Sequence, residues 1–103
     1  MATTSYPNIA LTSTADLTLQ TFHAGTRITS TFGSTINLVV TAALPADFSC
    51  WVIQYGTAAV AVTAGSGATV NGVGGAAATS GQYAAMKIMG VTDGNFIITG
   101  SIA

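Results

Sequence analysis

The residues of this 103-residue chain that could carry chemistry are few and scattered. They comprise one histidine, one cysteine and three carboxylates, with no glutamate: His23, Cys50, Asp16, Asp47 and Asp93. A Ser-His-Asp triad would depend on His23, but the chain has no Gly-x-Ser-x-Gly elbow. A single histidine beside a turn glycine is more often structural, so we expect no catalytic residues and no enzyme.

Metal and cofactor sites have equally weak support. His23 and Cys50 stand 27 positions apart, whereas a metal site needs clustered ligands. The three aspartates fall at expected turns, where Asp is common because its side chain hydrogen-bonds the backbone. This structural explanation is favoured over paired-carboxylate chemistry. The glycine-rich stretch at 65–67 lacks the third glycine of a dinucleotide fingerprint, Val70 standing in its place. We therefore expect no metal and no cofactor.

The composition points to self-association. Charged residues make up 5% of the chain, against roughly 25% in an ordinary soluble domain, and the formal net charge is −1. Such a chain has little repulsion between copies, which favours an oligomer over a threonine-coated monomer. Two basic residues are too few to neutralise a run of phosphates, so nucleic acid is not an expected partner. No apolar run approaches the roughly 18 residues that predict a membrane span, and Cys50 has no disulfide partner within the chain.

Period-2 alternation of apolar and polar residues predicts strands along most of the chain. The segments are 17–22, 26–32, 35–40, 48–55, 58–63, 68–71, 82–89 and 95–99. The residues of 83–89 also favour helix, but Gly81, Gly90 and the Asp93-Gly94 turn favour a hairpin. Short strands about ten residues apart predict one all-β domain over 15–103, a small antiparallel β-sandwich or barrel.

The segment 48–55 is apolar on both faces, which predicts a strand that is covered on both sides. Phe48, Cys50 and Val52 point one way, and Trp51, Ile53 and Tyr55 the other. Trp51 and Tyr55 could stack on a sugar ring. Because they share a face with Ile53, we favour buried packing for them and keep a ligand platform as the alternative.

Several short motifs in order resemble a pattern found in bacteriophage virion proteins. They are residues 23–25, 35–38, 44–56 (LPADFSCWVIQYG), 64–71 (AGSGATVN), 81–85 (GQYAA) and 96–100 (FIITG). The pattern is similar to that of capsid decoration or cement proteins and of head-fibre and tail-fibre C-terminal β-domains, and it extends over roughly 16–103. The resemblance implies a trimeric or otherwise symmetric β-domain without catalysis.

The resemblance leaves two roles open. The chain has its own Met1 and shows no shaft, heptads or anchoring domain, so we favour a decoration protein over a fibre tip. Such a protein would bind the major capsid protein on the outer surface of the virion as a homotrimer, and would stabilise the assembled shell. The alternative is a fibre-tip or receptor-binding module that recognises host surface glycans.

Residues 1–14 are polar and small, and they predict an extended N-terminal arm. They show neither the basic nor the apolar region of a signal peptide. The isolated apolar residues Tyr6, Ile9 and Leu11 are the candidates for contact with the capsid, by adding a strand to an exposed sheet edge. A disordered tail is the competing interpretation.

Overall fold

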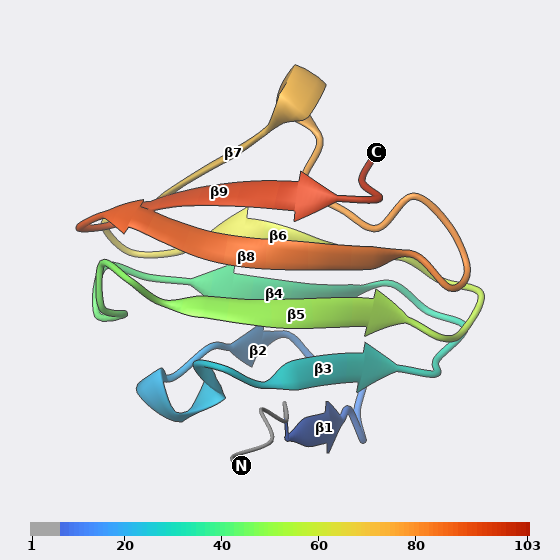
Figure 1. Cartoon of the computed structure of the whole chain (residues 1–103). Helices are drawn as coiled ribbons and strands as arrows, with labels where there is room; N and C mark the ends of the chain where they lie inside the picture. The colour runs from blue at the N-terminus through green and yellow to red at the C-terminus, as the bar shows by residue number, and fades with distance from the viewer. Residues whose placement is uncertain (1–6) are drawn as a thin grey trace, which may run out of the picture.

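A computed structural model describes residues 7–103 as an all-β fold of two sheets (Figure 1). The larger sheet has six strands in the order β1 (Asn8–Ala10), β3 (Arg27–Ser30), β5 (Ser49–Gln54), β8 (Ala85–Thr92), β9 (Asn95–Gly100) and β7 (Thr69–Gly72). The smaller sheet has three strands in the order β2 (Leu17–Thr18), β4 (Ile36–Val40) and β6 (Val60–Ala64). Short 3-10 helices lie at Thr21–His23 (η1) and Val73–Gly75 (η2).

The first six strands form a coil that alternates between the two sheets. β1, β3 and β5 pair in parallel in the larger sheet, and β2, β4 and β6 pair in parallel in the smaller one. One turn takes the chain from Asn8 to Arg27, and the next takes it from Arg27 to Trp51. This is the winding of a β-solenoid, so the all-β prediction is confirmed while the antiparallel sandwich or barrel is wrong.

A hairpin interrupts the parallel arrangement of the larger sheet. β8 pairs antiparallel with β5 and with β9, and β7 then pairs in parallel with β9. The turn between β8 and β9 holds Gly94 at φ 75°, a backbone conformation that glycine adopts without strain. The structure thereby confirms the hairpin at Asp93-Gly94 and the strand, rather than helix, predicted near 82–89.

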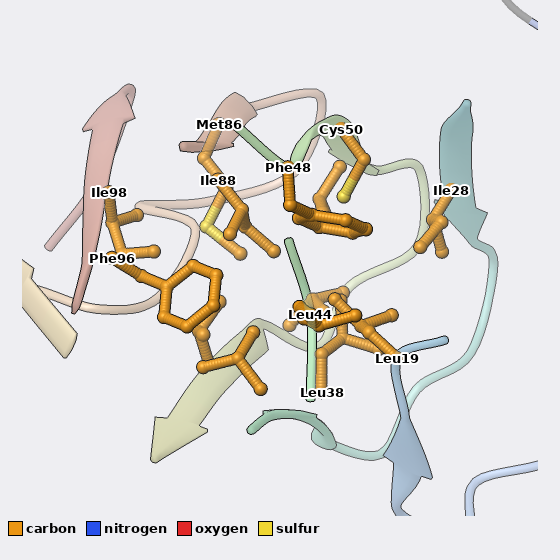
Figure 2. Packing of buried hydrophobic residues seen from close by; sticks show 14 of the residues in the cluster. Leu19, Ile28, Leu38, Leu44, Phe48, Cys50, Met86, Ile88, Phe96 and Ile98 are labelled. Atoms are coloured by element: carbon orange, nitrogen blue, oxygen red, sulfur yellow. The ribbon is translucent and has the colours of Figure 1, made fainter. Parts of the chain in front are cut away.

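The core lies between the two sheets. Alternate residues of each strand point inward, as in β5, where Cys50, Val52 and Gln54 are buried and their neighbours are not. Phe48 and Phe96 meet edge to face with ring centroids 6.5 Å apart, and the close-up view shows both rings among the aliphatic side chains (Figure 2). Burial of these side chains provides the main stabilisation of the fold.

One polar group of side chains crosses the end of this core. The Thr79 hydroxyl donates to Gln54 Oε1 at 2.6 Å and accepts from the Val60 amide at 2.9 Å. Gln54 Nε2 donates to the carbonyl oxygen of Gly56 at 3.2 Å. Across residues 7–103 every buried side-chain nitrogen or oxygen has a hydrogen-bond partner, as burial of polar atoms requires.

The described part of the predicted arm is built into the fold. Asn8–Ala10 form β1 at the edge of the larger sheet, and the amide of Leu11 donates to the carbonyl oxygen of Thr29. Of the helices in residues 7–103, none has the length and apolar character needed to cross a membrane.

Candidate functional site

The outward side of the six-stranded sheet is the main candidate for a functional surface, and we call it the outer face. The three-stranded sheet covers the other side of the larger sheet and lies behind it in Figure 1. Strand register places one row of outward residues side by side across five strands: Asn8, Arg27, Trp51, Lys87 and Thr99. A second row contains Ala10, Thr29, Ile53 and Ala85.

Large apolar side chains gather on the outer face, and residues 7–103 do not cover them. Trp51, Ile53 and Met89 are half-buried, and Ile97 is 37% exposed. An uncovered group of apolar side chains on a rigid sheet is typical of an interaction surface. The outer face therefore differs from the polar, solvated face usual for the second side of an antiparallel sheet.

Two tyrosines pair at the end of β5. Tyr55 is 58% exposed and Tyr83 is 67% exposed, and their rings meet edge to face with centroids 5.5 Å apart. Tyr83 has φ 70°, a left-handed conformation that side chains rarely adopt, and its amide donates to the carbonyl oxygen of Gln54 at 2.5 Å. Strained backbone of this kind gathers at functional sites, which makes the tyrosine pair a distinctive part of the outer face.

The position of Trp51 and Tyr55 corrects the prediction that they pack in the core. Both lie on the outer face, where Trp51 is half-buried and its ring has Lys87 Nζ 5.6 Å from the centroid. The apolar character of both faces of β5 predicts cover on both sides. Residues 7–103 supply that cover only on the side of Cys50 and Val52.

A shallow pocket of about 420 Å³ opens on the outer face across β1, β3 and β5, lined by Asn8, Arg27, Thr29, Ile53 and Tyr55. Asn8 Oδ1 accepts from Arg27 Nε at 3.2 Å and from Thr29 Oγ1 at 2.6 Å. Its acceptor is thus occupied, while the guanidinium and the Asn8 amide nitrogen are donors. The chemistry of the pocket suits a ligand that offers oxygen acceptors beside an apolar surface.

Charge is segregated between the outer face and the rest of the molecule. Arg27 and Lys87 are the only arginine and lysine in the sequence, and both lie in the first row of the outer face. The contacts that the structure gives them are with the Asn8 amide and the Trp51 ring, neither of which cancels their charge.

The three carboxylates lie elsewhere. Asp16 accepts from Asn37 Nδ2 on the three-stranded sheet at 3.3 Å. Asp47, in the β4–β5 connection, and Asp93, in the β8–β9 turn, are exposed. Both connecting segments lie at the same end of the molecule, on the left in Figure 1. The β4–β5 connection contacts strand β8 near this end, because the Gly90 amide of β8 donates to the carbonyl oxygen of Phe48 at 2.6 Å. We call this the acidic end.

The residues predicted to contact a capsid have mixed positions. Ile9 and Leu11 are partly buried and pack against the hydrophobic core, so their side chains already have partners within the chain. Tyr6 lies outside the described residues. A capsid contact through these three residues stays a prediction.

His23 and Cys50 have structural surroundings. His23 is 3% exposed, its Nδ1 accepts from the Gln20 amide at 2.8 Å, and its pKa is lowered because burial disfavours the imidazolium. Burial raises the pKa of the Cys50 thiol to about 12. Within the described range 7–103, no three His, Cys, Asp or Glu side chains form a group that could hold a metal ion.

Sequence reasoning missed the pocket and the charge segregation. Residues 8, 27 and 53 are far apart in the chain, and only the parallel register brings them together. The one available signal was that Arg27 and Lys87 are the only Arg and Lys residues.

No family model, no curated protein and no solved structure matches this chain.

Proposed function

We propose that this chain is a non-enzymatic structural protein of a bacteriophage particle, a decoration protein that binds the assembled capsid as a symmetric trimer. The phage assignment rests on the ordered motifs of the sequence, above all residues 44–56. The structure supports an assembly role through one observation, the uncovered apolar outer face of the six-stranded sheet.

The physical mechanism is linkage between binding and assembly. A protein that binds only the closed shell shifts the equilibrium away from the separated capsomers, by an amount set by its concentration and affinity. A trimer gains further because docking of one subunit raises the effective concentration of the other two at their sites. A stiff, nearly uncharged β-fold suits this task, since it loses little conformational freedom on binding.

The test is co-sedimentation with empty shells of a phage whose genome carries this sequence. Purified protein is mixed with expanded shells and, separately, with the same major capsid protein as free capsomers. We expect the protein to pellet with shells at a fixed stoichiometry and to raise their melting temperature. We expect it not to bind free capsomers. Absence of binding to shells, together with binding to host cells, would overturn the proposal.

A fibre-tip or receptor-binding module is the second candidate, and the pocket on the outer face favours it. Tyr55 supplies an exposed aromatic ring beside Arg27 and Asn8, an arrangement that suits a sugar. The discriminating experiment is a glycan array with the wild type and Tyr55→Ala. Saturable binding that the variant loses would favour the receptor-binding role.

A further inference from the structure

We propose that the outer face of one copy binds the acidic end of a second copy, so that the oligomer is built from head-to-tail contacts that close into a ring. This inference rests on the proposed symmetric oligomer and names the surfaces that form it. The occupant of the outer face is thus another copy of this chain, with Asp47 and Asp93 facing Arg27 and Lys87.

The placement of charge carries the argument. Both cationic side chains lie on the outer face, and two of the three carboxylates lie at the acidic end. In a chain with so few charges, the two surfaces are complementary to each other, and neither is complementary to itself. Like charges brought together across an interface are strongly unfavourable, whereas opposite charges set the register of docking.

A face-to-face dimer is therefore disfavoured. A two-fold contact of two outer faces would bring Arg27 and Lys87 of both copies together and no carboxylate with them. Head-to-tail contact instead joins two different surfaces of each copy, and such contacts form closed rings when the rotation between copies allows it. A trimer requires contacts of this kind.

The pocket gives the contact its chemical detail. Arg27 presents a planar guanidinium that matches a carboxylate, and Asn8 offers its amide nitrogen beside it. An aspartate on the exposed β8–β9 turn or the β4–β5 connection is the acceptor that such a donor set binds. The apolar residues around it, Ile53 and Tyr55, would be covered by the same contact.

Charge reversal tests the proposal with the full chain. One variant is Arg27→Asp with Lys87→Asp, a second is Asp47→Lys with Asp93→Lys, and a third carries all four changes and keeps the formal net charge of −1. Asp16→Lys is the control for a charge change away from both surfaces. Mass is measured by light scattering over a dilution series at low and high salt, and folding is checked by circular dichroism.

We expect each two-site variant to raise the dissociation constant of the oligomer at least about tenfold, and the four-site variant to restore it to within about threefold of the wild type. High salt should weaken the wild-type oligomer. A folded four-site variant that stays as dissociated as the two-site variants would overturn the proposal, as would two-site variants that associate normally. A further arm measures binding of glucuronic acid to the wild type and to Arg27→Gln. If the wild type binds this sugar without a change in its oligomeric mass, and Arg27→Gln does not bind it, the pocket would be assigned to a free acidic sugar instead.

Shell binding keeps this inference separable from the proposed function. A wild type that stays monomeric in solution but pellets with shells overturns the head-to-tail contact and leaves decoration standing. Restoration of the oligomer by the four-site variant, without any binding to shells, supports the contact and overturns decoration.

Discussion

Replacement of Thr79 by Val is the sharpest test of how the end of the core is held together. Val has nearly the shape of Thr but lacks the hydroxyl that donates to Gln54 Oε1 and accepts from the Val60 amide. Gln54 and Thr79 are 2% and 4% exposed, so water does not replace the lost partner. The variant leaves one buried acceptor and one buried donor without a hydrogen bond.

The expected cost follows from those two groups. Each buried polar group left unpaired costs about 1–3 kcal/mol, so the two groups together should lower the free energy of unfolding of Thr79→Val by about 2–6 kcal/mol. A small domain has only about 5–15 kcal/mol in total. With a urea m-value of about 1 kcal/mol/M for a chain of this size, the unfolding midpoint should fall by roughly 2–6 M.

The assay is urea unfolding followed by Trp51 fluorescence, with all variants at one protein concentration, because oligomerisation makes the midpoint concentration-dependent. Thr79→Ser is the matched control: it keeps the hydroxyl and loses one methyl group, which costs about 1 kcal/mol. The double variant Gln54→Leu with Thr79→Val should cost less than the sum of the single changes. A Val variant no less stable than the Ser variant would refute the reasoning.

Three further outcomes follow from individual residues. Because burial lowers the pKa of His23 below its ordinary 6.5, the unfolded chain binds a proton that the folded chain does not, so stability is full above pH 6.5 and falls as the pH drops below it. The urea midpoint of the wild type should therefore fall between pH 7 and 5, and His23→Asn should reduce this pH dependence. A wild-type midpoint that does not change over this pH range would contradict the prediction. Burial raises the pKa of the Cys50 thiol from 9.0 to about 12, which lowers its thiolate fraction about 1,000-fold near neutral pH. Ellman's reagent should therefore label Cys50 only in denaturant, and rapid labelling of the folded protein would argue against burial of the thiol. At Gly56 an added Cβ would lie 2.6 Å from the carbonyl carbon of Thr31, so Gly56→Ala should lower the free energy of unfolding in urea by about 1–3 kcal/mol. A Cβ added at the control position Gly81 meets open space, so Gly81→Ala should change it by less than about 0.5 kcal/mol. Equal effects of the two substitutions would count against the close approach at Gly56.

Strand positions were accessible from the sequence because alternation is a local property. The inward set of β5 and the hairpin at Asp93-Gly94 follow from period 2 and from turn chemistry, and the structure has both. Even the helix-favouring residues near 83–89 form a strand, since flanking glycines and the turn outweigh a weak propensity.

Strand pairing was not accessible, because alternation gives no direction or partner. The turns of the coil differ in length, 19 positions from Asn8 to Arg27 and 24 from Arg27 to Trp51, so the sequence has no constant period that would reveal a repeat. The prediction of antiparallel neighbours therefore failed at β3 and β5. The outer face was missed for the same reason, since its rows exist only once the register is known.

The position of β9 between β8 and β7 has a consequence for the order of folding. β7 ends at Gly72, yet its only sheet neighbour is β9, which begins at Asn95. The coil from β1 to β6 precedes the hairpin in the chain, so we expect a growing polypeptide to form it first. A nascent chain that stops before Asn95 leaves β7 without backbone partners, and the larger sheet closes in a late step that waits for the hairpin.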